Sequence, residues 1–403
     1  MTQDEILHSP PSVFDTCITP SIVKKEVIQT FDLTRKSYCN HDGEPEIFPV
    51  VQRLEVEYAR GHCPNYLPIL GHEGFRKAAT ELALGSESPA ILENRAVGIQ
   101  SLSGTGALRS GADFLFQILQ IATVYLPNPS WDVHYDIFRY AGFTNVRTYR
   151  YCDVQRKTFN MESMLQDLQE ASKKSVVLLH ASAHVPSGIT PSMEQWKMIA
   201  RVVKQRKLFP FFYLDQQGLA SGDLEQDSWP IRYFVHQGLE LFVAQSFSKI
   251  FGLYSETVGN LIAVVNDVRV IESVNSQFTL LNVSRFSNPP AFGAFLVHQV
   301  LTSPCLRKEW LEQLKRMTRR MRETRLALSS ALAELGTPGT WTHIGRQSGL
   351  YCSLGLTRGQ INYLREKHNF QLFKNGCLNM SCLNKHNIEN FAKALDSTIK
   401  KTL

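Results

Sequence analysis

The chain has 403 residues, of which 43% are hydrophobic and 20% charged, and its 43 basic and 37 acidic residues give a formal net charge of +6. This length and composition are typical of a globular protein with more than one domain, and they exclude a disordered or fibrous chain. The mild positive charge is spread along the chain, so it does not indicate nucleic-acid binding and is compatible with anionic small molecules.

The start of the chain and its cysteines indicate the expected compartment. The first sixteen residues, MTQDEILHSPPSVFDT, include acidic side chains and no apolar core, so we expect neither a secretory signal nor a mitochondrial transit peptide. The eight cysteines are scattered singly, as expected for reduced thiols. No apolar run is long enough to span a bilayer. We therefore expect a cytoplasmic protein that does not bind membranes.

Strand and helix patterns alternate through the first 250 residues. Short apolar runs predict strands at 96–102, at the start of 123–131, and at 175–180, 208–215 and 239–247. Amphipathic patterns predict helices at 107–122, 161–171 and 192–206. In the first of these, Leu108, Ala112, Leu115 and Leu119 share one helical face. This alternation favours an α/β fold with a mainly parallel, doubly wound sheet.

After about residue 305 the pattern changes. Residues 306–336 form one long helical pattern, and a short alternating tail follows. We expect residues 1–44 to form an N-terminal arm and part of a small domain, 45–305 a large domain, and 306–403 a linking helix with the rest of a small α+β domain. The basic run KRMTRRMRETR has no interleaved aromatic residues, so we interpret it as a solvated helix face and expect no nucleic-acid partner.

A turn of small residues follows the first predicted strand. Ser103, Gly104 and Thr105 lie where that strand ends and a helix begins. Backbone N–H groups at a helix N-terminus bind anions, and small side chains let a phosphate approach closely. The turn matches neither the P-loop nor the G-x-G-x-x-G pattern. The alternative is an ordinary capped turn without a ligand.

Lys249 directly follows an apolar strand and lies between Ser246 and Ser248. A lysine in this place is expected to be partly desolvated, which favours the neutral amine and its attack on an aldehyde. The alternative is an ordinary solvated lysine. A lysine that forms a Schiff base, together with a phosphate-binding turn, suggests pyridoxal 5'-phosphate as the cofactor.

Eight segments resemble, in the same order, those of the aspartate aminotransferases, in particular the cytosolic animal type. They are 65–76 (NYLPILGHEGFR), 100–114 (QSLSGTGALRSGADF), 128–134 (NPSWDVH), 176–188 (VVLLHASAHVPSG), 210–222 (PFFYLDQQGLASG), 245–261 (QSFSKIFGLYSETVGNL), 287–294 (SNPPAFGA) and 337–344 (TPGTWTHI). The resemblance implies the fold of the type I pyridoxal-phosphate-dependent transferases, with a large α/β domain and a smaller α+β domain.

The resemblance also implies roles for individual residues. Lys249 would bind the cofactor covalently and later move the substrate's α-proton. Tyr66 would reach the phosphate from a partner subunit, which implies a homodimer, and Trp131 would stack on the cofactor ring. The remaining cofactor-binding residues would be Ser103, Gly104, Thr105, Ser246 and Ser248, with His134 and His180 behind the ring. The spacing of His180 and His184 at a strand exit does not favour a metal site.

Three positions that contact the cofactor ring in the family differ here. The asparagine that bonds the ring hydroxyl is Val185, and the tyrosine that does so is Gln216. The aspartate that keeps the ring nitrogen protonated is Tyr213. Asp215 is displaced from it by two residues, roughly 6–7 Å along a strand, so it replaces that aspartate only if the backbone shifts.

Three family arginines are also replaced. The phosphate-binding arginine is Thr257, the arginine that binds the substrate α-carboxylate is Cys377, and the one that binds the distal carboxylate is Val283. Neither cysteine nor valine reproduces a bidentate arginine–carboxylate pair. We consider two cations as substitutes in the substrate site: Lys36, which the resemblance aligns with a glycine that lies against the substrate, and Arg285, two residues from Val283.

Three functions remain open on this sequence. The first is a pyridoxal-phosphate-dependent aspartate aminotransferase that converts L-aspartate and 2-oxoglutarate to oxaloacetate and L-glutamate, weakened by the lost arginines and aspartate. The second is other pyridoxal phosphate chemistry on amino or keto acids, such as racemisation. The third is a non-catalytic homologue kept for dimerisation or binding. The retained Lys249 favours the first of these.

Overall fold

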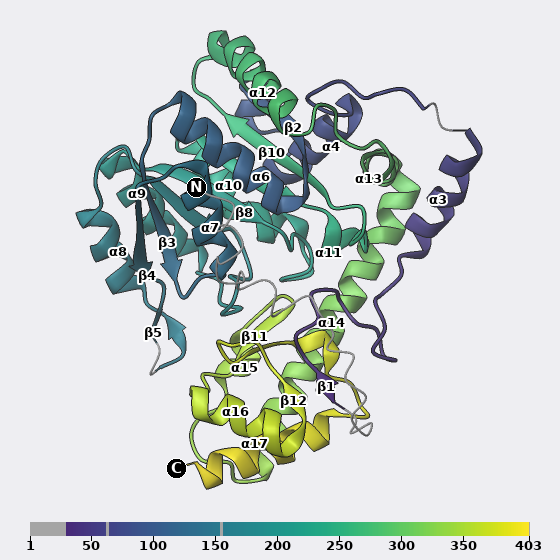
Figure 1. The fold of residues 1–403 in the computed structure, drawn as a ribbon, viewed down its shortest axis with the longest axis vertical. Coiled ribbons are helices and arrows are strands. Elements are labelled where there is room, and N and C mark those ends of the chain that lie inside the picture. The colour runs from purple at the N-terminus through teal and green to yellow at the C-terminus, as the bar shows by residue number, and fades with distance from the viewer. Residues whose placement is uncertain (1–29, 62–63, 154–155, 403) are drawn as a thin grey trace, which may run out of the picture.

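The computed structural model describes residues 30–61, 64–153 and 156–402, so residues 1–29 of the expected N-terminal arm lie outside the described residues. A seven-stranded sheet forms the upper part of the molecule in Figure 1, with the strand order β2-β10-β9-β8-β7-β3-β4. Its strands are β2 (Ala96–Leu102), β3 (Thr123–Asn128), β4 (Asn145–Arg150), β7 (Val176–His180), β8 (Phe209–Leu214), β9 (Leu241–Ser246) and β10 (Val258–Val264). Only β10 runs antiparallel to its neighbours; the other pairs are parallel.

Helices cover both faces of this sheet. One face packs against α6 (Ser103–Asp113), α7 (Asp132–Ala141) and α12 (Ile271–Arg285). The other face packs against α4 (Glu73–Leu84), α8 (Met161–Glu170), α9 (Met193–Arg206) and α10 (Leu224–His236). Alternate strand residues therefore enter two separate apolar layers; Phe211 and Phe212, for example, are both fully buried but lie on opposite faces. This is the doubly wound α/β architecture that the sequence predicts.

A long helix, α14 (Pro304–Glu334), runs from beside the sheet into the lower part of the molecule (Figure 1). There, two small sheets and three helices enclose a separate apolar cluster. These elements are β1 (Phe31–Asp32), β11 (Tyr351–Ser353), β12 (Phe370–Gln371), β13 (Cys377–Asn379), α15 (His343–Arg346), α16 (Arg358–His368) and α17 (Ile388–Lys401). Because β1 pairs with β12, the segment after residue 30 belongs to this lower part.

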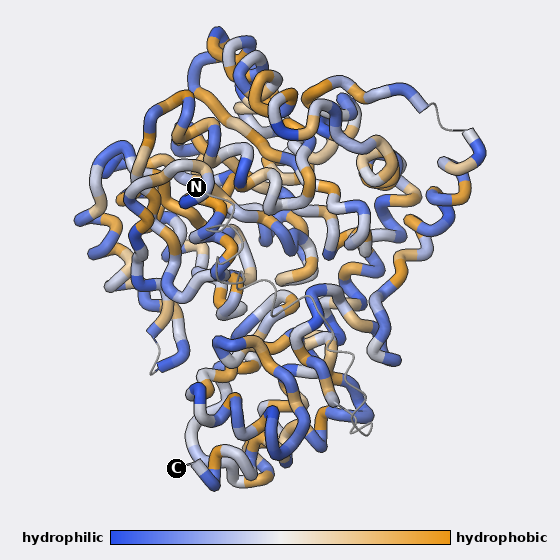
Figure 2. The backbone as a smooth tube through the Cα atoms, viewed as in Figure 1, coloured by the Kyte–Doolittle hydropathy of each residue, from blue (hydrophilic) through white to orange (hydrophobic). Residues whose placement is uncertain are grey.

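The remaining elements are short or connect the two parts. They are α3 (Pro49–Gly61), α5 (Pro89–Leu92), η1 (Phe114–Ile118), β5 (Cys152–Asp153), β6 (Thr158–Phe159), α11 (Ser248–Phe251), η2 (Val268–Val270), α13 (Phe292–Thr302) and η3 (Met380–Cys382). Hydrophobic residues concentrate on the sheet strands and on the inward faces of the helices (Figure 2). Among the described residues, no helix is long and apolar enough to cross a bilayer.

The predicted strand at 96–102 is confirmed, and the predicted helices at 161–171 and 192–206 match α8 and α9 to within one residue. The helix predicted at 107–122 is wrong at both ends. It begins at Ser103, and it changes at Phe114 into a π-helical turn that ends at Ile118. Leu119 is therefore the residue that caps the turn, and it is half exposed rather than part of the buried face.

Candidate active site

The predicted site residues meet at one edge of the sheet, where β2, β3, β7, β8 and β9 end. Because these five strands run in the same direction, their C-terminal ends lie at one edge. Beyond these ends come Ser103 at the start of α6, Trp131 just before α7, and Lys249 in α11. In α/β sheets, ligands bind at this kind of edge.

The turn at the start of α6 has the geometry of an anion cradle. Its N-cap residue is Leu102, whose side chain cannot accept hydrogen bonds from the N–H groups of the first turn. Ser103 has a positive φ of 65°. A Cβ atom on Gly104 would lie only 3.0 Å from the Cβ of Ser246, so glycine brings the backbone of α6 against the end of β9. The Ser103 N–H donates to the Thr257 carbonyl oxygen, so the following N–H groups of the first turn are the ones suited to a phosphate.

The side chain of Lys249 is buried and paired. Its Nζ donates a short hydrogen bond to the Asp215 carboxylate, and the two side chains are 15% and 3% exposed. Nζ also lies 5.4 Å from the centre of the Tyr351 ring, within the range of a cation–π contact. Burial lowers the pKa of Lys249, but the charge of Asp215 outweighs it, so the pKa lies above its ordinary value. Lys249 is therefore held as an ammonium ion.

Tyr213 is the residue that the resemblance aligns with the family's ring-nitrogen aspartate. It is 6% exposed, and its ring packs edge-on against His134 and His180, with centroid separations of 5.4 Å in both cases. On its other side, its Cε2 would lie 3.0 Å from a Cβ at Gly104. Burial raises the pKa of Tyr213, so its hydroxyl is neutral. Its phenol thus fills space next to the phosphate cradle without bringing a charge.

Three histidines line the buried side of this site. The Nδ1 atoms of His134 and His184 hydrogen-bond to serine hydroxyls, at 3.0 and 2.8 Å. Burial lowers the pKa of His180 to about 3, with a further contribution from the charge of Lys249. The Nε2 atoms of all three rings are buried without a hydrogen-bond partner among the described residues. The histidines are therefore neutral rings, and none supplies a charge to replace the missing aspartate.

Gln216, at the position of the family's ring-hydroxyl tyrosine, joins the upper and lower parts of the molecule. Its Oε1 accepts a hydrogen bond of 2.6 Å from the Leu350 N–H, and its Nε2 donates one of 3.4 Å to the Ala183 carbonyl. A Cβ on Gly349 would lie 2.7 Å from Gln216 Oε1, so glycine is required beside it. The side chain is fully occupied by these structural contacts.

The positions of the two substrate arginines carry no charge. Cys377, in β13, is 2% exposed and its Sγ lies 3.4 Å from the Pro186 carbonyl oxygen. Burial raises the pKa of its thiol to about 12, so it stays protonated. Val283, in α12, is 50% exposed in the single chain. Neither position supplies a group that binds a carboxylate.

The two candidate replacement cations lie in different surroundings. Lys36 is exposed in the segment after β1. Arg285 donates hydrogen bonds to the Ser110 hydroxyl, at 2.7 Å, and to the Asp113 carboxylate. Because Asp113 is 1% exposed, Arg285 compensates a buried charge on α6 together with Arg109, and of the two candidate cations only Lys36 has no ion pair with a described residue. Tyr66 is 90% exposed, as expected for a residue that acts outside its own chain.

Two further residues belong to the site and were not predicted. Tyr351 contacts Lys249 from the lower part of the molecule, about a hundred residues away in the sequence. The Tyr254 hydroxyl accepts a hydrogen bond of 2.8 Å from the Tyr38 N–H and so ties the turn after α11 to the segment after β1. Tyr351 stands in no local pattern that marks it, whereas Tyr254 lies in the 245–261 segment, where no role was predicted for it. The sequence allows Asp215 to replace the family's ring-nitrogen aspartate only if the backbone shifts, and it does not predict the pairing of Asp215 with Lys249.

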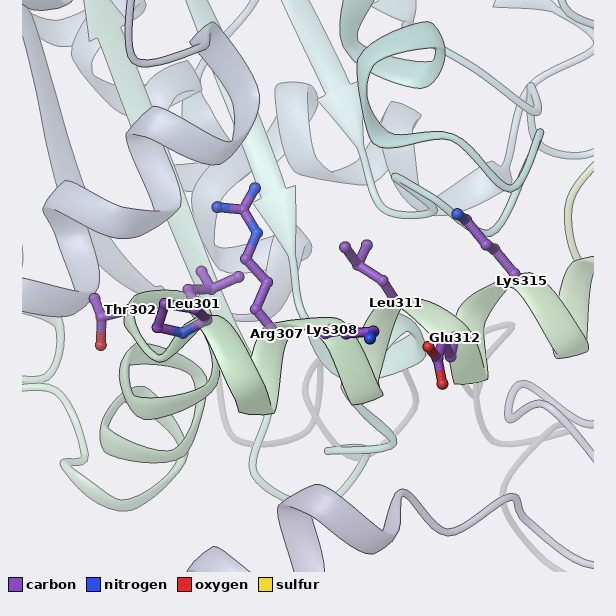
Figure 3. Close-up of a pocket in the computed structure, with 8 residues that line it drawn as sticks. Leu301, Thr302, Arg307, Lys308, Leu311, Glu312 and Lys315 are labelled. Atoms are coloured by element: carbon purple, nitrogen blue, oxygen red, sulfur yellow. The ribbon is translucent and has the colours of Figure 1, made fainter.

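No group of three or more metal-ligating side chains comes together among the described residues. A separate hollow of about 500 Å³ lies along α13 and α14 (Figure 3). It is lined by Leu301, Thr302, Pro304, Arg307, Lys308, Leu311, Glu312 and Lys315. None of these residues surrounds Lys249, so this hollow is distinct from the candidate active site.

Comparison with known proteins places this geometry in context. Residues 29–395 match the family model described as aminotransferase class I and II. The cytoplasmic aspartate aminotransferase of Caenorhabditis elegans is 49% identical over 371 residues, covering 92% of this chain and 91% of that protein. The corresponding protein of Gallus gallus is 42% identical over 372 residues, covering 91% and 90%.

Solved structures agree with the sequence relatives. An aromatic-amino-acid aminotransferase from Burkholderia pseudomallei, covalently bound to pyridoxal phosphate, matches with a TM-score of 0.92 at 32% identity, covering 99% of this chain and all of that chain. The cytoplasmic aspartate aminotransferase of Saccharomyces cerevisiae matches with a TM-score of 0.91 at 33% identity, covering 94% of each chain. The likeness therefore extends through both the upper and lower parts of the molecule.

Proposed function

Because the chain belongs to the aminotransferase class I and II family, we propose that it is an aspartate aminotransferase-like protein that binds pyridoxal 5'-phosphate through Lys249. The observation that carries the proposal is that the α6 turn and Lys249 lie at the same sheet edge, joined by the close approach of Gly104 to Ser246. The relatives named as cytoplasmic aspartate aminotransferases support the substrate class and a cytoplasmic location.

The residues present fit the phosphate and aldehyde ends of the cofactor. The N–H groups of Gly104 and Thr105 would hold the phosphate, with the hydroxyls of Ser103, Ser246 and Ser248 beside them, since the Ser103 N–H donates to the Thr257 carbonyl. When bound, the cofactor supplies an electron-withdrawing ring on which an amino group is transferred. Lys249 would carry the proton between substrate carbon and cofactor, and Trp131 would position the ring by stacking.

The substrate end fits less well, which is why we propose a weakened activity. Cys377 and Val283 cannot hold the two carboxylates of aspartate or 2-oxoglutarate, and the neutral Tyr213 does not hold a proton on a ring nitrogen. Loss of a buried charge partner costs about 3–5 kcal/mol, or roughly a hundred- to a few thousand-fold in rate. Lys36 is the remaining candidate to bind a substrate carboxylate.

The decisive experiment is borohydride reduction of the purified protein after addition of pyridoxal 5'-phosphate, followed by peptide mass spectrometry. The proposal requires a stable adduct on Lys249. Adducts only on exposed lysines, or no adduct, would contradict it. An aspartate and 2-oxoglutarate assay then measures how far the activity is reduced.

A non-catalytic homologue is the second candidate. The observation that favours it is the pairing of Lys249 with Asp215, together with the uncharged Cys377 and Val283. It predicts normal folding and dimerisation with no transamination under any substrate pair tested. Cofactor capture without turnover would favour this second candidate over the first.

We also propose a homodimer, with the chain divided into a large domain at 45–305 and a small domain built from the N-terminal segment and residues 306–403. The exposed Tyr66 and the half-exposed Val283 support an interface on this side of the sheet. Light scattering at micromolar concentration tests the dimer, and a monomer would remove the basis for Tyr66 as a cofactor contact.

A further inference from the structure

Asp215 has no assigned role, and its placement indicates one. It follows β8 on the same face as Tyr213, and its carboxylate is almost completely removed from water. Instead of pointing to a solvent-exposed cation, it accepts a hydrogen bond from the ammonium group of Lys249. A buried carboxylate and a buried lysine in direct contact stabilise each other's charged forms.

We propose that Asp215 is an internal counterion that keeps Lys249 protonated and so restrains its reaction with aldehydes, including the cofactor. This inference rests on the proposed function for its biological meaning. Condensation of an amine with an aldehyde forms a carbon–nitrogen double bond and releases one water. Because only the neutral amine attacks, Lys249 must first lose a proton to solvent, and the carboxylate beside it opposes that loss.

The other groups that face Lys249 do not replace Asp215 in this role. Tyr213, Tyr254 and Tyr351 are buried, and burial raises the pKa of each hydroxyl, so all three are neutral at physiological pH. His180, on β7, is also neutral because burial lowers its pKa. Among the described residues that face Lys249, Asp215 is therefore the one whose side chain is negatively charged.

Lys157 provides a natural reference within the same chain. It too is partly buried and lies over an aromatic ring, with its Nζ 4.8 Å from the centre of the Trp341 ring. Its Nζ donates to a neutral acceptor, the Leu354 carbonyl, at 3.1 Å. Burial lowers its pKa, whereas the pKa of Lys249 is raised. The two lysines thus share burial and ring contact and differ in the carboxylate.

The test is reductive methylation with formaldehyde and cyanoborohydride at pH 7.5, with the extent at each lysine followed by peptide mass spectrometry. In the unmodified protein we expect Lys249 to react at least about tenfold more slowly than Lys157, because one pKa unit changes the neutral fraction tenfold. The Asp215→Asn variant should speed methylation at Lys249 by at least about tenfold and leave Lys157 unchanged. The Asp215→Glu variant should remain slow.

The control is Asp227→Asn, which alters another buried carboxylate, on α10, that accepts hydrogen bonds from N–H groups of the preceding turn at 218–221 and has no contact with Lys249 among the described residues. It should leave the Lys249 rate unchanged. Equal Lys249 rates in the unmodified protein and Asp215→Asn would overturn the inference. If Asp215→Asn does not fold, Lys249 reacting as fast as Lys157 in the unmodified protein would overturn it as well.

Adding pyridoxal 5'-phosphate in place of formaldehyde separates this inference from the proposed function. Faster methylation of Asp215→Asn with no cofactor adduct in either protein would support the counterion and contradict the proposed function. Cofactor capture at the same rate and with the same pH dependence in both proteins would support the function and overturn the counterion.

Discussion

The two ends of the candidate active site differ in how much of the family's chemistry they retain. At the α6 turn, Ser103, Gly104 and Thr105 have the residue types that the resemblance predicts for a phosphate site, and Gly104 approaches β9 closely. At the opposite end, Cys377 and Val283, which the resemblance aligns with two substrate-binding arginines, are both uncharged. Anion binding at the turn relies on backbone N–H groups, whereas carboxylate binding relies on particular side chains. Side-chain chemistry can therefore be lost while the backbone cradle remains.

The largest expected effect is at the cofactor end of the site, which contains Lys249 and the α6 turn. Lys249→Ala should abolish the covalent cofactor adduct completely. Among the described residues, Lys249 is the lysine that pairs with Asp215 at this edge of the sheet. The adduct is measured by reduction and mass spectrometry. Lys157→Ala, which removes another partly buried lysine, serves as control and should leave the adduct intact. An undiminished amount of adduct in Lys249→Ala would show that the cofactor does not bind through Lys249.

The next prediction restores positive charge at the substrate end of the site, at Cys377 and Val283. Replacing Cys377 and Val283 together by arginine should raise kcat/KM for aspartate by at least about a hundredfold, the low end for one recovered charge pair. Steady-state kinetics measures this, and the melting temperature shows whether the buried Cys377 position accepts the larger side chain. Arginines at the exposed Cys305 and Val268 provide the matched control. No gain, in a variant that still folds, would mean that this end has been remodelled beyond its charges.

A smaller effect is expected within the cradle itself. Gly104→Ala should weaken cofactor binding by about tenfold, because the new methyl group meets Ser246 and Tyr213 at 3.0 Å and pushes the turn away. Gly106→Ala is the control, since a Cβ there lies at an ordinary 3.4 Å from Leu102. Cofactor titration by absorbance measures both. Equal affinities for the two variants would contradict the claim that the turn is held at close contact.

The smallest effect concerns the neutral histidines between the two ends. The folded-state pKa of His180 is about 3, below its ordinary value of about 6.5, so the unfolded chain binds more protons in that interval. Stability should therefore fall as pH decreases from about 6.5, by up to about 1.4 kcal/mol per pH unit for this residue. Urea unfolding of the protein and of His180→Gln across pH 5–7 measures the difference. Identical slopes would show that folding does not lower the pKa of His180.

Much of the fold was predictable because it depends on local patterns. The strand at 96–102 and the helices at 161–171 and 192–206 follow from apolar periodicity alone. The end of α6 could not be predicted. No helix-breaking residue marks the π-helical turn at Phe114, whose side chain packs in the apolar layer between the sheet and α12. Sequence periodicity carries no information about such a turn.

The site was predictable to a similar, partial degree. Lys249 and the turn at Ser103 stand in short local motifs, and each directly follows a strand, as predicted. The partners of charged groups were not predictable, because they depend on tertiary contacts. Arg285 pairs with Asp113 on α6, and Tyr351 reaches Lys249 from the lower part of the molecule. A sequence identifies which charges are present but not which of them neutralise each other.

The side chain of Gln216 has a mechanical consequence. Its Nε2 donates to the Ala183 carbonyl within the upper part, and its Oε1 accepts a hydrogen bond from the Leu350 N–H of the lower part. The Ser348 N–H, bonded to the Gly188 carbonyl at 2.7 Å, and the contact of Cys377 with the Pro186 carbonyl also join the two parts. Separating the parts here would leave the buried Oε1 of Gln216 without its partner, at a cost of about 1–3 kcal/mol. Entry of a ligand by separation of the two parts at this contact therefore carries that free-energy cost.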